Sequence, residues 1–241
     1  FAECKYLENI IIPSNIKTIG ESAFSYCSGF EQKAWGDDDY GKYDTVCDIN
    51  FEEGSLLEII GEEAFYGTSM TGTFTIPKNV KSIGKYAFSG IARYYDWYYF
   101  GEYEEYHEGV AIVFEEGFSM DVIPEGLFYD SIITSIEIPA SVKVIGKKAF
   151  VNYESSMGTN EKGLMELTFA EGSQLTEIQE NAFSDQFVLE TIDLPATLTT
   201  IGASAFDGCI NLTTVTYAGA QSNLSIADGN DDLTSVITYL G

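Results

Sequence analysis

Few residues of this chain have the type and spacing that catalysis requires. The single histidine, His107, is not paired with a serine or cysteine in a nucleophile motif. Glutamate pairs stand at Glu52/Glu53 and Glu115/Glu116, and both follow a strand-like run in the same way, which indicates a role in a turn. HExxH, GxSxG and glycine-rich phosphate loops do not occur in a fitting context. We therefore expect no enzyme activity, no catalytic residues and no cofactor.

Two acidic clusters carry oxygen ligands of the kind that bind Ca²⁺. One is Asp37–Asp39, and the other comprises Asp228, Asn230, Asp231 and Asp232. Neither has the alternating ligands and distal glutamate of a calcium loop. Capping and turn formation explain the second cluster equally well, and we predict no metal site.

The charge of the chain excludes some classes of partner. Its 38 acidic and 12 basic residues give a formal net charge of −26. Such a surface repels nucleic acid and anionic membranes, since both are bound through Lys and Arg. No apolar run approaches the roughly 18 residues of a membrane span. The charge favours solubility, and it leaves open the attraction of basic partners or loosely held divalent cations.

A repeat organises the sequence. Each copy has an apolar residue, an isoleucine three positions later, usually a glycine, and a phenylalanine five positions after the isoleucine. The copies are IKTIGESAF (16–24), LEIIGEEAF (57–65), VKSIGKYAF (80–88), MDVIPEGLF (120–128), VKVIGKKAF (142–150), LTEIQENAF (175–183) and LTTIGASAF (198–206). Phe1 matches the last residue of a further copy, so we expect the sequence to start within a repeat.

Short alternating runs between these copies predict β-strands of two kinds. One kind closes with proline, as in LENIIIP, TGTFTIP, ITSIEIP and LETIDLP. The other closes with an acidic-glycine turn, as in VCDINFEEGS, GVAIVFEEGF and LMELTFAEGS. The two kinds alternate along the chain. Insertions near 28–46, 91–108 and 152–163 all precede the second kind, which places them on one edge of the structure.

One repeat cannot bury its apolar side alone, whereas stacked repeats share a continuous core. We therefore predict an α/β-type repeat solenoid with a parallel strand ladder on one face and short helical or 3₁₀ turns on the other. The glycine after isoleucine is expected to allow a sharp corner. Cys4, Cys27 and Cys209 share one repeat position and should form a buried column of small residues with free thiols.

Repeats of the form IPxxVxxIGxxAFxxC resemble the BspA-like class of bacterial leucine-rich repeats over nearly the whole chain. The resemblance implies a single solenoid over 1–241, closed by a capping coil at 219–241. It also implies a secreted or cell-surface bacterial protein that functions in adhesion and protein recognition.

The insertions carry the strongest candidates for ligand binding, because Trp and Tyr favour recognition sites. The outward columns of the ladder are small, threonine-rich and mildly acidic, and they are weaker candidates. The aromatic side chains either fold back onto the stack or remain exposed as a recognition patch. The candidate residues are Trp35, Tyr94, Tyr95, Trp97, Tyr98, Tyr99, Tyr103 and Tyr106.

We expect a non-enzymatic, monomeric, extracellular domain that binds a host or neighbouring-cell protein. One alternative is a carbohydrate-binding module that stacks sugars on Trp35 and Trp97. The other is a passive spacer within a longer surface protein.

Overall fold

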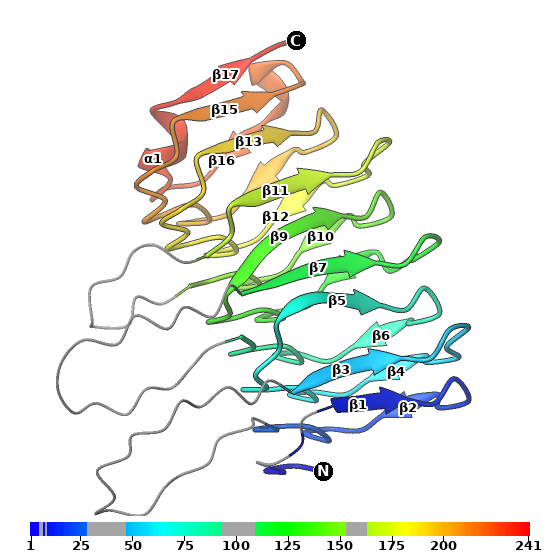
Figure 1. Ribbon diagram of the computed structural model, residues 1–241. Coiled ribbons are helices and arrows are strands. Elements are labelled where there is room, and N and C mark those ends of the chain that lie inside the picture. Colours follow the sequence, from blue (N-terminus) through cyan, green and yellow to red (C-terminus); the bar gives the residue numbers. More distant parts are fainter. Residues whose placement is uncertain (5–6, 8, 28–46, 93–108, 153–162) are drawn as a thin grey trace, which may run out of the picture.

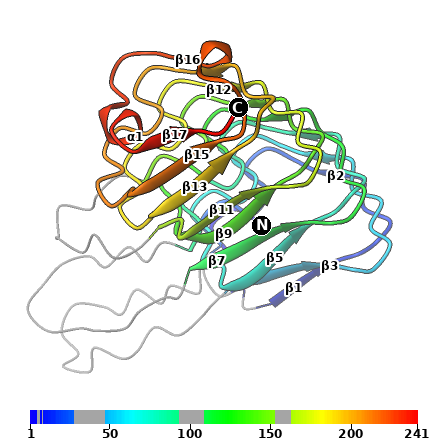
Figure 2. The ribbon, with the colours of Figure 1, turned by 90° about the horizontal axis from the view of Figure 1, so that it is seen from above.

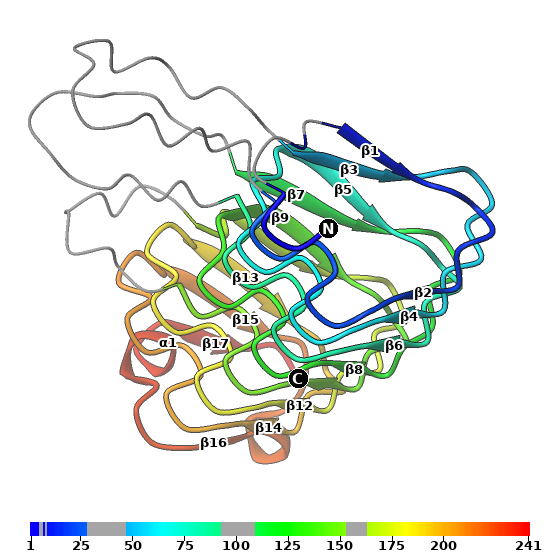
Figure 3. The same ribbon diagram turned by 90° about the horizontal axis from the view of Figure 1, so that it is seen from below.

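A computed structural model describes residues 1–4, 7, 9–27, 47–92, 109–152 and 163–241. In this part, the chain forms coils that stack in sequence order from the N-terminus to the C-terminus (Figure 1). Views along the stack show long strands on one side and short strands on another, with the backbone winding around the space between them (Figures 2 and 3). The predicted repeat solenoid with parallel strands is confirmed.

The long strands form the main ladder, in which every pairing is parallel. Hydrogen bonds divide it into three groups, β1-β3, β5-β7-β9-β11 and β13-β15-β17. Its strands are β1 (Asn9–Ile12), β3 (Asp48–Phe51), β5 (Gly72–Ile76), β7 (Val110–Phe114), β9 (Ile133–Ile138), β11 (Glu166–Phe169), β13 (Thr191–Leu194), β15 (Thr214–Tyr217) and β17 (Ile237–Tyr239).

The short strands contain the repeat isoleucines and form a second parallel ladder. Within each group, isoleucine lies over isoleucine, as with Ile19, Ile60 and Ile83. The groups are β2-β4-β6 and β8-β10-β12-β14-β16. The strands are β2 (Thr18–Ile19), β4 (Ile59–Ile60), β6 (Ser82–Ile83), β8 (Val122–Ile123), β10 (Val144–Ile145), β12 (Glu177–Ile178), β14 (Thr200–Ile201) and β16 (Ser225–Ile226).

The segment after each short strand forms turns in place of the expected helical or 3₁₀ turn. The N–H of Phe24 donates to Ala64 of the next coil, whereas the N–H of Ala23 donates to Gly20 within its own coil. In this segment every second N–H group donates to a carbonyl of the neighbouring coil. A continuous helix cannot form, because it would need these N–H groups for bonds within the segment. Among the described residues, helices occur only in the last coil, as η1 (Gln221–Asn223) and α1 (Asp231–Thr234).

The repeat phenylalanines form one column through the core. Neighbouring rings are stacked, with centroids 4.9 to 5.6 Å apart. Phe1, at the end of the column, is exposed, whereas burying each of the other rings contributes about 1.5–3 kcal/mol. The stacked contacts hold successive coils in register. The column comprises Phe1, Phe24, Phe65, Phe88, Phe128, Phe150, Phe183 and Phe206.

The glycine after the repeat isoleucine is needed for close stacking, and the predicted corner is not its role. Gly61 and Gly84 do not have positive φ. A Cβ on Gly61 would lie 2.5 Å from the N atom of Glu21, and one on Gly84 would lie 2.3 Å from the N atom of Glu62. Both contacts are with the backbone of the preceding coil. Gly20 has no atom within 4 Å of such a Cβ.

At the position three residues after the phenylalanine, five coils hold a side chain that donates a hydrogen bond to the preceding coil, whereas the coil of Phe88 has Ile91 there. Thr68 Oγ1 donates to the carbonyl of Phe24 over 2.9 Å, and Ser131 Oγ donates to that of Phe88 over 2.8 Å. In the same way Cys27, Gln186 and Cys209 donate to Phe1, Phe150 and Phe183. The cysteines are free thiols, as expected. Cys27 and Cys209 serve as donors to the preceding coil, a role beyond the expected filling of space. Cys4, which was expected to be buried, is only partly buried.

Asn230 completes the turns of the last full repeat. Its Oδ1 accepts the N–H of Phe206 over 3.0 Å, where earlier coils use a carbonyl of the next coil. Its Nδ2 donates to the carbonyls of Gly202 and Ala227. Asn230 is only 2% exposed, so its side chain replaces the backbone partners that a further turn would supply.

Candidate binding site on the main ladder

All eight aromatic candidates, Trp35, Tyr94, Tyr95, Trp97, Tyr98, Tyr99, Tyr103 and Tyr106, lie outside the described residues, as do His107 and Asp37–Asp39. These residues lie in two stretches of the sequence, which are flanked by the described residues Cys27 and Cys47, and Ala92 and Gly109. Within the part of the chain that the structure describes, no group of three or more His, Cys, Asp or Glu side chains is arranged to hold a metal ion.

The outward columns of the main ladder pair as the sequence predicts. Asn9 lies beside Asp48, Ser135 beside Glu166, and Thr191 beside Thr214. A second column places Glu137 beside Thr168 and Asp193 beside Thr216. These side chains are exposed or half-buried, and the core does not use them.

The main ladder is interrupted where a proline-ending strand follows an acidic-glycine strand. β3 does not pair with β5, and β11 does not pair with β13. β7 and β9 pair only as far as Ile112 and Ile136, with a register shift. After an acidic-glycine strand, the next residue donates its N–H to a backbone carbonyl of the preceding coil, as Glu115 does to the carbonyl of Ile76. Pro77, Pro139 and Pro195 stand at the equivalent position after proline-ending strands and have no N–H to donate.

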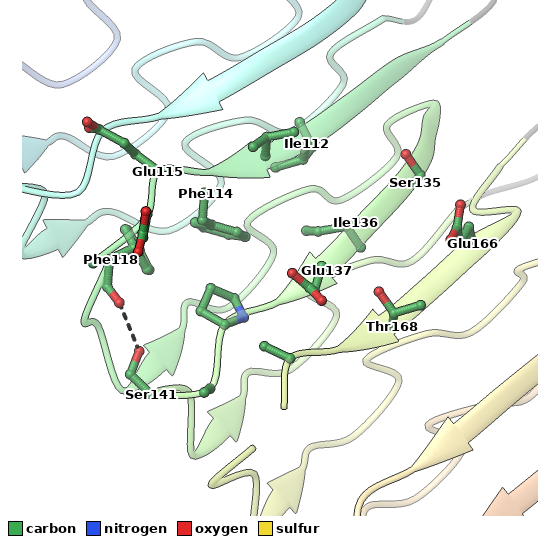
Figure 4. A pocket seen from close by; sticks show the side chains of 16 residues that line it. Ile112, Phe114, Glu115, Phe118, Ser135, Ile136, Glu137, Ser141, Glu166 and Thr168 are labelled. Carbon is green, nitrogen blue, oxygen red and sulfur yellow. Dashed lines mark hydrogen bonds between the residues drawn. The ribbon is translucent and has the colours of Figure 1, made fainter. Parts of the chain in front are cut away.

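A hollow of about 470 Å³ opens over β7, β9 and β11, at the end where β7 and β9 separate (Figure 4). Its apolar part includes Phe114 and Phe118, whose ring centroids are 4.6 Å apart. Phe114 is half-buried, whereas Ile76 and Ile138 at the same position of the adjacent strands are fully buried. The interruption therefore opens part of an aromatic ring to a ligand. A similar hollow of about 230 Å³ lies between β3 and β5.

Four carboxylates line the larger hollow, and no lysine or arginine among the described residues does. Glu115 is already engaged, because its Oε2 accepts the N–H of Lys78 over 3.0 Å and its Oε1 lies 3.4 Å from Lys78 Nζ. Glu116, Glu137 and Glu166 form no hydrogen bond or ion pair with another described residue. Ser135 and Thr168 add hydroxyl groups. The hollow combines an aromatic surface with uncompensated negative charge.

Sequence reasoning missed this hollow, although its signal was present. The alternation of proline-ending and acidic-glycine strands marks each interruption, and phenylalanine closes every acidic strand, as at Phe51, Phe114 and Phe169. Phe114 belongs to the inward side of its strand, and the interruption is what lets it border the hollow.

The glutamates after these strands hold turns together, as predicted. Glu52 Oε2 accepts the N–H of Ser14 over 2.8 Å, as Glu115 does from Lys78. This backbone hydrogen bond lowers the pKa of Glu52. Each bond joins an acidic strand to the preceding proline-ending coil, so it supplies the partner for the N–H that follows the proline.

Ion pairs also connect neighbouring coils. Lys81 pairs with Glu58 over 2.7 Å, Lys85 with Glu125 over 2.6 Å and Lys147 with Glu180 over 3.0 Å. The hydrogen bond from Lys81 lowers the pKa of Glu58, and that to Glu125 raises the pKa of Lys85. Each pair is solvent-exposed, so water and salt screen it and it contributes little to stability.

The stacked coils and their repeat positions match a known family model. The model of the BspA type leucine rich repeat region matches in six copies, at residues 37–96 and 121–228. The chain belongs to this family. The BspA-type resemblance seen in the sequence is therefore confirmed. Within the described residues, no helix has the length and apolar character needed to cross a bilayer.

Solved structures of other bacterial proteins resemble this chain at low sequence identity. A leucine-rich repeat protein from Bacteroides ovatus ATCC 8483 is 21% identical, with a TM-score of 0.64 over 98% of this chain and 50% of that chain. The pneumococcal vaccine antigen PcpA is 19% identical, with a TM-score of 0.45 over 98% of this chain and 57% of that one. This BspA-type chain thus spans between 50% and 57% of their length. No curated protein sequence matches it significantly.

Proposed function

We propose that this chain is a non-enzymatic, protein-binding domain of a bacterial cell-surface or secreted protein. The observation that carries the proposal is the main ladder, where a shared core fixes the strands and leaves two columns of outward side chains free for contact. Leucine-rich repeat solenoids use such extended surfaces for recognition. Family membership supports a surface or secreted location and a role without catalysis.

The partner is a protein of a host or of a neighbouring cell, and the domain itself is a monomer. The net charge of −26 favours partners with a basic surface, because opposite potentials steer encounter. The aromatic residues Trp35, Trp97 and their tyrosine neighbours are further candidates for contact with the partner, because Trp and Tyr favour recognition sites.

Parallel protein and glycan arrays test this proposal. We expect saturable binding to purified extracellular proteins that survives enzymatic removal of their glycans. Binding to saccharides alone, lost in Trp97→Ala or Trp35→Ala, would establish a carbohydrate-binding module instead. Binding to neither array would favour a spacer within a longer surface protein.

A further inference from the structure

We propose that the hollow over β7, β9 and β11 binds an arginine side chain presented by a protein partner. This inference rests on the proposed protein-binding function and specifies the chemistry of one contact. Its occupant follows from the lining, which supplies an aromatic surface and carboxylates within one open space of about 470 Å³.

The aromatic part suits the guanidinium group and its aliphatic stem. Phe114 is half-buried beside Phe118, and β7 and β9 are no longer paired at this point. Arginine stacks on aromatic faces and is more weakly hydrated than an ammonium group, so it loses less solvation in such a site. Pro139 and Ala140 line the same space and can pack against the methylene groups.

The charged part supplies the complementary acceptors. Glu116, Glu137 and Glu166 line the hollow from the turn after β7, from β9 and from β11, and none is paired with another described residue. Figure 4 shows Glu137 and Glu166 on neighbouring strands, near the hydroxyl groups of Ser135 and Thr168. A guanidinium group has five donors, which several carboxylate and hydroxyl oxygens can accept together.

The hollow is a better candidate for this contact than other acidic parts of the ladder. Glu115 and Glu52 are occupied by backbone N–H groups, and Asp193 accepts the hydroxyl of Thr216. The hollow between β3 and β5 is about 230 Å³, and Asp48 is the one carboxylate among the described residues that line it. Unpaired carboxylates and an accessible aromatic ring therefore occur together over β7, β9 and β11.

The test uses short acetylated and amidated Gly/Ser peptides with one central arginine, lysine or citrulline. Binding is followed by the NMR shifts of the backbone amides of β7, β9 and β11. We expect the arginine peptide to bind most tightly. Citrulline has nearly the same shape without the charge, and we expect it to bind about ten-fold more weakly, as a loss of about 1.4 kcal/mol implies.

Matched variants locate the contact. Glu137→Gln and Glu166→Gln should each weaken arginine binding about two- to five-fold, as expected for exposed ion pairs of up to about 1 kcal/mol. Asp193→Asn removes the same charge from the same ladder face outside the hollow and should change binding little. Ala170→Lys places a competing cation in the hollow and should abolish binding, whereas Ala218→Lys, at the equivalent position after β15, should not.

Equal binding of the citrulline peptide, equal effects of the variants and their controls, or shifts away from these strands would overturn the proposal. The absence of any peptide binding would do the same. If the domain nevertheless binds a protein on the array, the proposed function stands and only the assignment of the hollow falls. If the array also shows no protein partner, both fall.

Discussion

At the scale of single residues, glycines without a Cβ atom allow neighbouring coils to approach each other closely. Gly61, Gly84 and Gly202 lie where a Cβ would approach the backbone of the preceding coil to 2.3–2.6 Å. Two other coils carry Pro124 and Gln179 at this position, so the requirement is local to particular pairs of coils.

Gly61→Ala should therefore lower the free energy of unfolding by about 1–3 kcal/mol, because overpacking forces the two backbones apart. Gly20→Ala is the matched control, since the same repeat position has open space there. Urea denaturation of both variants measures the difference. Equal effects would show that conformational freedom, and not coil spacing, determines the glycine.

Cys209 shows a second residue-scale requirement, for a donor facing the preceding coil. Its Sγ donates to the carbonyl of Phe183 over 3.2 Å. We expect Cys209→Ser to retain most of the stability because a hydroxyl donates to the same carbonyl. Cys209→Ala should cost about 1–3 kcal/mol, since the buried acceptor loses this partner. Chemical denaturation at neutral pH compares them, and an equal loss in both variants would contradict the donor role.

The same thiol makes stability depend on alkaline pH. Burial raises the pKa of Cys209 to about 12 from an ordinary value of 9.0. Below pH 9 the thiol is protonated in both the folded and unfolded chains, and its contribution is complete. Between pH 9 and about 12 the unfolded chain loses the proton first, so the stability falls as the pH rises. Replacement by serine should make this fall shallower, and an unchanged slope would contradict the linkage.

At the scale of elements, the last coil is stabilised by the side chain of Asn230, which makes the hydrogen bonds that backbone groups make in earlier coils. Asn230 accepts the N–H of Phe206 and donates to the carbonyls of Gly202 and Ala227. Asn230→Ala should lower the free energy of unfolding by about 1–3 kcal/mol through the unpaired buried groups. Asn223→Ala is the control, because Asn223 is exposed in the same coil. Hydrogen exchange at Phe206 should accelerate only in Asn230→Ala, and protection in both variants would argue against a capping role.

Sequence reasoning succeeded where each repeat acts in the same way and failed where neighbouring coils differ. The spacing from isoleucine to phenylalanine predicted the parallel ladders, because the same residues must meet in every layer. The expected helical turn was wrong because half of its N–H groups bind the next coil, which one repeat alone does not reveal. The hollow depends on Phe114 and Pro139, which belong to different repeats. The hollow forms because these two residues line the same space where β7 and β9 stop pairing, and the sequence of one repeat does not show this.

At the scale of the whole molecule, unbalanced charge opposes the compact state. The chain carries 38 acidic and 12 basic residues, and the inter-coil ion pairs Lys81–Glu58, Lys85–Glu125 and Lys147–Glu180 are exposed. Salt at about 0.1 M screens charges more than about 10 Å apart, so it should relieve the long-range repulsion more than it weakens the close pairs. We expect Tm to rise with NaCl at neutral pH, as measured by calorimetry. A falling Tm would mean that the ion pairs dominate.

The glutamate bonds from Glu52 to Ser14 and from Glu115 to Lys78 have a consequence for how such a chain can grow. They join β3 and β7 to the proline-ending coils before them, so each of these two pairs of coils forms a structural doublet. Duplication or loss of a whole doublet preserves every kind of junction, whereas a single-coil change brings two strands of one kind together. Length should therefore vary in even steps, and each added doublet would bring one more interruption of the ladder.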